Sequence, residues 1–236
     1  MLLSDFFTVL STGELGGVVL GNRNGAGIAV EDYSTVVSHI NLGLTALHTR
    51  LLLREEEVFV QEYDNIQLYY LLPQYAISNT TSTEPYKYIV DSVFQPFQGN
   101  VLKIEQVFNE IGLDLPINDP NNRMSVHTPQ YNCLQIPFAD ATNAVSVIYR
   151  ANHPRIVVGA GFDPAQVTLE IPDQVVEALA CYVGARAFIG NAADNGKNDV
   201  NLHLTRFEQL VQQLEQADLL NSNGGTNLKL RDNGWV

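Results

Sequence analysis

The chain has 236 residues, of which 45% are hydrophobic and 17% charged, so it can bury a large core and is too apolar to be disordered. Its formal net charge of −13 argues against a protein that grips DNA or an anionic membrane through a basic surface. The start, Met1–Asp5, lacks the basic residues and the long apolar run of a signal peptide, which predicts a cytoplasmic setting.

The first part of the chain is predicted to be helical. Two short helices are expected before residue 20. A long amphipathic helix is then predicted from Glu31 to Arg54, because acidic residues at its start and Arg50 and Arg54 at its end suit the helix dipole. The intervening segment 21–27, GNRNGAG, superficially resembles a nucleotide-binding loop. It lacks the preceding strand, the third glycine and the following lysine that such loops need, so no nucleotide cofactor is predicted.

From Glu55 onward, apolar residues recur at every second position, which predicts strands. Asp64–Asn65 lies between two alternating runs and favours a tight hairpin. Several short strands without intervening helices favour a compact antiparallel sheet or a small barrel. Residues 55–171 hold 14 acidic and five basic side chains, so this region carries much of the negative charge. Further strand-like runs cover residues 88–93, 101–108, 132–136, 144–150 and 167–171.

The segment 171–191 predicts a helix that is buried on several sides. Pro172 and Asp173 suit a first turn, and almost every later residue up to Ile189 is apolar. Its small residues are expected to let another helix approach closely, and we call them the bundle-packing strip: Ala180, Cys181, Gly184 and Ala185. A further helix from Asn198 is expected to fold back on this one as a helical hairpin.

These elements predict an α+β fold in which two distant parts of the chain share one core. Residues 1–54 and 172–220 are expected to form an antiparallel helical bundle, and residues 55–171 an inserted β lobe, a small antiparallel sheet or barrel. Residues 221–236 are expected to be an extended tail. Its Asn, Ser and Gly residues precede four apolar ones, which predicts a docking tail, with a frayed terminus as the alternative. The apolar residues of the tail are Leu228, Leu230, Trp235 and Val236.

Motifs for catalysis or metal binding are sparse. The five histidines are scattered without His-Glu-x-x-His spacing, and the two cysteines do not form a Cys-x-x-Cys pair, so no metal ligands and no cofactor are predicted. No Gly-x-Ser-x-Gly occurs. Cys133 and His127 are the only nucleophile and base close in sequence, and both cysteines suit small core positions better. The sequence therefore predicts no catalytic residues, and a hydrolase stays open as a weaker alternative.

The order of several short patches resembles that of tailed-bacteriophage head-to-tail connector proteins, the adaptor family. The likeness spans nearly the whole chain and depends on the order of the patches and on the closing Gly-Trp-Val. The patches are Leu3-Ser4-Asp5, Gly13-Glu14-Leu15, Leu115-Pro116-Ile117-Asn118-Asp119-Pro120, Thr128-Pro129-Gln130, Leu134-Gln135-Ile136-Pro137, Tyr149-Arg150-Ala151-Asn152-His153-Pro154, Ile171-Pro172 and Gly234-Trp235-Val236.

The resemblance implies a structural virion protein of the neck, assembled in the host cytoplasm. It implies an oligomeric ring, typically of twelve copies, beneath the portal, with each subunit a helical bundle carrying a β lobe and a C-terminal tail that reaches the portal. Such a ring links the capsid to a downstream tail protein and continues the DNA channel. Acidic residues lining that channel would repel phosphates, so DNA would pass without specific binding. No membrane partner is expected, and another tail ring component, a stopper or completion protein, is the alternative.

Overall fold

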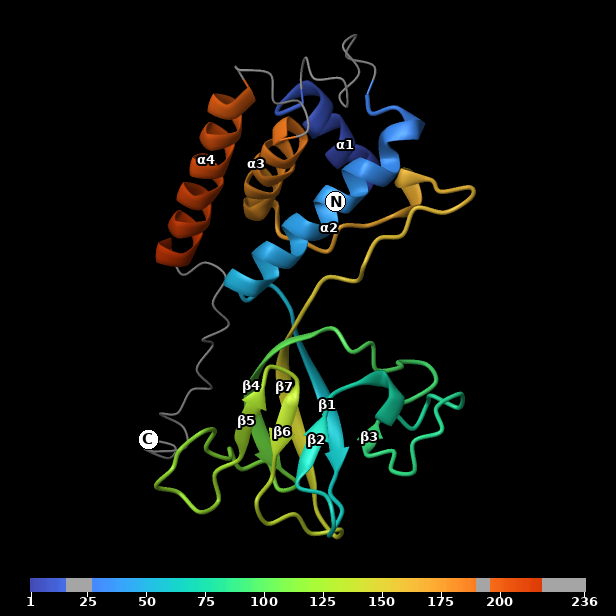
Figure 1. The fold of residues 1–236 in the computed structure, drawn as a ribbon, viewed down its shortest axis with the longest axis vertical. Helices are drawn as coiled ribbons and strands as arrows, with labels where there is room; N and C mark the ends of the chain where they lie inside the picture. Colours follow the sequence, from blue (N-terminus) through green and yellow to red (C-terminus); the bar gives the residue numbers. More distant parts are fainter. Residues whose placement is uncertain (16–26, 190–195, 218–236) are drawn as a thin grey trace, which may run out of the picture. The chain divides into compact units, whose positions relative to one another are not determined.

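A computed structural model describes residues 1–15, 27–189 and 196–217 of the chain (Figure 1). This part is mixed α+β, with four α-helices and two small antiparallel sheets. It divides into two compact units. The helical unit combines residues 1–53 with the described residues from His153 onward, and the β unit is Arg54–Asn152. Neither sheet closes on itself, so the small barrel that the sequence left open is not formed.

The helical unit owes its helices to apolar residues at helical spacing. In α2, Val36, Ile40, Leu44 and Leu47 recur every three or four residues and are buried. In α3, buried residues lie on all sides, as its apolar sequence predicts. None of the described helices is long and apolar enough to cross a lipid bilayer. The elements are α1 (Leu3–Thr12), η2 (Val30–Asp32), α2 (Tyr33–Arg50), η4 (Pro164–Gln166), α3 (Asp173–Ile189) and α4 (Gly196–Ala217).

One core joins the helices from both ends of the sequence. The α4 helix packs along α3 (Figure 1), and the rings of Tyr182 and Phe207 meet there at a centroid distance of 5.3 Å. The α2 helix approaches α3 at Gly43, where an added Cβ would lie 2.6 Å from Leu179 Cδ1. This close approach lies outside the strip that the sequence singled out. Buried members of the core include Leu3, Phe6, Leu10, Ile40, Leu44, Leu47, Val175, Leu179, Val183, Phe207 and Val211.

The larger sheet of the β unit has the strand order β3-β1-β7-β4, and all neighbouring strands are antiparallel. Side chains alternate between its faces, so that Val58 and Val60 of β1 lie opposite Val147 and Val145 of β7 on the buried face. Its strands are β1 (Glu55–Gln61), β3 (Ile89–Val90), β4 (Val101–Asn109) and β7 (Ala144–Ala151).

The smaller sheet has the order β2-β6-β5 and shares one core with the larger sheet. Tyr69 and Leu134 from the smaller sheet are fully buried in the same cluster as Val60 and Val107 from the larger one. The strands β2 (Leu68–Tyr70) and β6 (Cys133–Gln135) were expected, whereas β5 (His127–Gln130), which contains Pro129, was not. A 3-10 turn, η3 (Pro73–Tyr75), follows β2.

The hairpin predicted around Asp64–Asn65 is wrong, because β1 and β2 belong to different sheets. The end of β1 is bound instead to the segment that leads into β7. Asp64 Oδ1 accepts a hydrogen bond from Ala141 N at 2.8 Å, and Glu62 N donates to Asn143 O at 3.0 Å. The turn residues are present, but these long-range hydrogen bonds decide which strands pair.

Residues 153–171 differ from the expectation that the β lobe runs to residue 171. They belong to the helical unit, and Thr168 makes an isolated bridge to Leu2 in place of the expected strand. Leu169 N donates to Met1 O at 2.9 Å, and Leu169 is buried in the helical core. Asn41 of α2 binds the backbone N and O of Ile156 at 3.0 and 2.9 Å. The segment thus lies against the N-terminus and α2.

Candidate functional site

The bundle-packing strip lies on α3, where other parts of the helical unit approach it. Ala180, Cys181 and Ala185 are buried. Gly184 lies against the segment after α1 and against α4, since an added Cβ would be 3.1 Å from Glu14 Cβ and 3.5 Å from two ring atoms of His203. The docking-tail residues Leu228, Leu230, Trp235 and Val236 lie outside the residues that the structure describes.

Exposed aromatic side chains distinguish the β unit from the helical unit. In the described part of the chain, every aromatic residue with an exposed side chain belongs to the β unit. Large aromatic rings are usually buried in a free subunit and are enriched where proteins contact one another. These residues are therefore the strongest candidates for contacts with other molecules. They are Phe59, Tyr86, Phe94, Tyr131 and Phe138.

One apolar surface lies at the β3 edge of the larger sheet, and we call it the edge surface: Phe59, Val90, Val93 and Phe94. Phe59 of β1 pairs with Val90 of β3, which places both side chains on the same, outward face. Val93 and Phe94 form the tip of a tight turn closed by Gln95 N donating to Ser92 O at 3.1 Å. At this tip, Val93 is 80% exposed and Phe94 is fully exposed.

The loop that carries Phe94 is held by one carboxylate. Asp91 Oδ1 accepts from Ser78 N at 2.8 Å, and its Oδ2 accepts from Phe97 N at 2.9 Å. Burial opposes ionisation of this carboxyl, but the hydrogen bonds from Ser78 and Phe97 outweigh it and lower the pKa of Asp91. Phe97 in turn packs on Tyr149 of β7 at a centroid distance of 6.0 Å. The ring of Phe94 is thus presented by an anchored loop.

A second apolar surface is a pocket near the far end of β4, at the opposite edge of the larger sheet from β3. We call it the β4 pocket; its volume is about 180 Å³. Its rim carries the exposed side chains of Ile111, Met124 and Phe138, and the guanidinium of Arg123 lies 5.8 Å from the centroid of the Phe138 ring. The pocket thus combines an apolar rim with a cation stacked on an aromatic ring.

Glu62 contributes a buried carboxyl group to the lining of the β4 pocket. Its Oε2 accepts a hydrogen bond from Asp140 N at 2.9 Å. Burial is the main reason why the pKa of Glu62 is raised, and the neighbouring carboxylates of Asp140 and Glu110 add to the effect. The pocket therefore has an acidic group on its inner side and a basic group at its rim.

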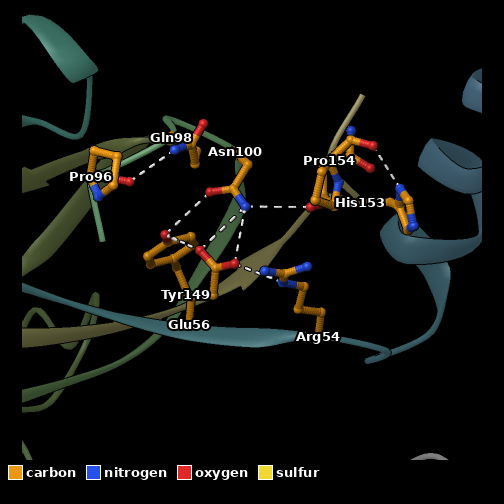
Figure 2. Close-up of polar contacts among 9 residues, drawn as sticks. Arg54, Glu56, Pro96, Gln98, Asn100, Tyr149, His153 and Pro154 are labelled. Atoms are coloured by element: carbon orange, nitrogen blue, oxygen red, sulfur yellow. Dashed lines mark hydrogen bonds and ion pairs between the residues drawn. The ribbon is translucent and has the colours of Figure 1, made fainter. Parts of the chain in front are cut away.

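A polar cluster around Glu56 joins the two ends of the β unit (Figure 2). Tyr149 OH donates to Glu56 Oε2 at 2.7 Å, and Arg54 Nε contacts Glu56 Oε1 at 2.7 Å. Asn100 Nδ2 donates to both carboxylate oxygens at 3.2 and 3.3 Å. Tyr149 is almost fully buried, and burial followed by the Glu56 carboxylate raises the pKa of its hydroxyl. Because these side chains bond to one another, we interpret the cluster as a structural part of the β unit.

The nucleophile and base suggested by the sequence lie on neighbouring strands without facing each other. In the register of β5 and β6, Cys133 is opposite Gln130, whereas His127 is opposite Gln135. Cys133 is buried, and burial raises the pKa of its thiol. A buried thiol with a raised pKa is a poor nucleophile, so this arrangement suits a core position better than catalysis.

Sequence reasoning missed both apolar surfaces of the β unit. The turn Ser92-Val93-Phe94-Gln95 carries two large apolar residues at positions where turns favour polar ones, and that mismatch is the only local signal. The β4 pocket has no such signal, because its rim comes from three separate segments. No known family model matches the sequence, and no curated protein is significantly similar to it.

Proposed function

We propose that the protein is a structural component of a phage neck, a head-to-tail adaptor that forms a ring beneath the portal and links the capsid to the tail. The observation that carries this proposal is the concentration of exposed aromatic residues on the β unit, at two different places. The order of the short sequence motifs, which resembles that of the adaptor family, also supports the proposal. In this proposal the helices act as the bundle of each subunit and the β unit as its inserted lobe.

A ring needs two unlike surfaces on each subunit that meet head to tail. The edge surface lies beside β3, and the β4 pocket lies at the other edge of the same sheet. A protruding Phe94 and an apolar pocket on the same unit are the two unlike surfaces that such a contact requires. An isologous dimer, in contrast, would use one surface twice.

The negative charge of the β unit also suits a channel for DNA. Arg54–Asn152 holds 12 acidic and five basic side chains, a balance of −7. Carboxylates facing a channel would repel the phosphates, so the genome would slide past them without binding. Basic residues would instead hold DNA through counterion release.

The decisive experiment is electron microscopy of the purified chain mixed with isolated portal. A second ring stacked on the portal is the expected result. A ring that forms only on a preassembled adaptor and never on the portal would support the alternative of a stopper or completion protein. Deleting residues 221–236 is expected to abolish portal docking while the subunit stays folded, and unaltered docking of the truncated chain would refute the docking tail.

Phe94→Ser tests the subunit contact directly. Because Phe94 is fully exposed, the variant should fold normally and fail to form rings, since a desolvated aromatic anchor contributes a large share of contact energy. Gln95→Ala, an exposed position in the same turn, is the matched control and should assemble like the parent. Analytical ultracentrifugation in the presence of portal measures ring formation by both variants. Rings formed equally well by Phe94→Ser would contradict a role for the edge surface.

A further inference from the structure

Three side chains that can bind metal ions converge in the helical unit, although they are far apart in the sequence. Glu14 follows α1, Cys181 lies in α3 and His203 lies in α4. One ligand atom from each lies within 4.8 Å of the other two. His203 Nδ1 is 2.8 Å from Glu14 Oε2, and Cys181 Sγ is 3.9 Å from Glu14 Oε1.

The donor set and the spacing suit Zn²⁺. Thiolate, imidazole and carboxylate ligands bind zinc at roughly 2.0–2.3 Å in tetrahedral geometry, which separates the ligand atoms by roughly 3–4 Å. The observed separations of 2.8 and 3.9 Å lie close to that range. A thiolate among the ligands disfavours Mg²⁺ and Ca²⁺, which prefer oxygen ligands alone.

The surroundings hold two of the ligands in place. Cys181 is fully buried, and the ring of Phe188 stacks on that of His203 at 5.2 Å with an interplanar angle of 17°. Gly184, one turn after Cys181, has no side chain that would fill the space, since a Cβ there would lie 3.1 Å from Glu14. The glycine thus lets Glu14 and His203 lie close to α3.

Arg206 is the one positive side chain recorded near these ligands in the described part of the helical unit, and its geometry allows it to withdraw. Its Nη2 pairs with Glu177, while Nη1 lies 3.9 Å from Glu14 Oε1. The Arg206 side chain is half exposed. It can therefore keep its contact with Glu177 while Glu14 turns toward an ion.

We propose that Glu14, Cys181 and His203 form a site for one Zn²⁺ ion, with water at the fourth position. Three protein ligands and one open position are the usual pattern of zinc sites that keep an exchangeable ligand. The ion ties the segment after α1 to α3 and α4, so its binding stabilises the helical unit. The sequence predicts no such site because the ligands come from positions 14, 181 and 203, without any local spacing motif.

The full-length chain, freed of metal with a chelator, is titrated with Co²⁺ as a spectroscopic substitute for Zn²⁺. The expected result is a thiolate-to-cobalt absorption band that saturates at one ion per chain and is lost when Zn²⁺ is added. Cys181→Ser should lack the band, and the matched control Cys133→Ser should retain it. A parent chain without the band, or Cys181→Ser with an unchanged band, overturns the proposal.

A second measurement keeps the test valid if Cys181→Ser fails to fold. His203→Gln replaces a mostly buried side chain, and its thermal unfolding is followed by calorimetry with and without Zn²⁺. Zn²⁺ is expected to raise the melting temperature of the parent and of Cys133→Ser, and to leave that of His203→Gln unchanged. An equal rise in His203→Gln shows that the ion binds elsewhere and refutes the site.

Discussion

The two units differ, in the described part of the chain, in the aromatic side chains that they leave exposed. In the helical unit, aromatic rings pack inside, as Phe7 does on Tyr33 at 5.2 Å and Tyr182 on Phe207. In the β unit, rings such as Tyr69 and Tyr149 are also buried, while others such as Phe94 are exposed. Both units expose some aliphatic side chains, such as Val30 and Val93, but among the described residues only the β unit exposes aromatic rings.

The sharpest test of this difference compares a buried residue of one unit with an exposed residue of the other. Ile40→Ala removes a fully buried side chain from α2 and should lower the free energy of unfolding by about 2–5 kcal/mol. Phe94→Ala should change it by less than about 0.5 kcal/mol, because the ring is fully exposed. Chemical denaturation measures both. A large loss of stability in Phe94→Ala would show that this ring supports its own unit.

Overpacking of the helical core is the next largest effect. Gly184→Leu places a bulky side chain where Cβ alone would lie 3.1 Å from Glu14, so it should destabilise by about 1–3 kcal/mol. Gly159→Leu is a control, since an added Cβ there meets no atom within 4 Å. A thermal melt of Gly184→Leu that matches the parent would mean that this part of α3 is not tightly packed.

The buried carboxyl of the β unit gives a smaller effect that depends on pH. The folded state raises the pKa of Glu62 above its ordinary value near 4.5, so folding favours the protonated form. Its contribution to stability is therefore complete below the unfolded pKa and is lost as pH rises through the folded pKa. Glu62→Gln should remove this part of the pH dependence. Denaturation curves recorded at several pH values in this interval give the free energy of unfolding as a function of pH. The same pH dependence in the parent and in Glu62→Gln would contradict the prediction.

The smallest effect is expected for an ion pair on the surface of the helical unit. Arg50 contacts Glu208 at 2.5 Å and Glu215 at 3.4 Å, and all three side chains are partly exposed. Solvent screens such pairs, so Arg50→Ala should cost about 0–1 kcal/mol. Raising the salt concentration should further reduce the difference in the free energy of unfolding between the parent and Arg50→Ala. A loss as large as that of Ile40→Ala would mean that charges, as well as apolar packing, hold α4 in place.

The sequence predicts the helices better than the sheet topology. Helices α2 and α3 follow from local spacing, because residues such as Ile40 and Leu44 lie one turn apart. Strand β7 was predicted as a strand, but its pairing with β1 and β4 depends on residues more than 35 positions away. The wrong hairpin at Asp64 shows the limit: the turn motif is local, whereas its hydrogen bond to Ala141 is not.

The candidate surfaces could be predicted even less well, since solvent exposure depends on the whole fold. Nothing near Phe138 in the sequence indicates that Ile111 and Met124 join it at one pocket. Likewise, Gly43 gives the close approach between α2 and α3, although it stands in an ordinary amphipathic pattern. The small residues of α3 drew attention because they are clustered, whereas the single Gly43, which approaches Leu179 and Tyr182, gave no comparable signal.

The β unit begins and ends at the same place, because Ala151 N donates to Arg54 O at 3.0 Å. A segment whose two ends are already adjacent can be lengthened, exchanged or transplanted with little entropic cost of closing the host chain. The lobe is therefore a cassette: a related chain could acquire a different contact surface by replacing residues 54–152 and leaving its helices unaltered.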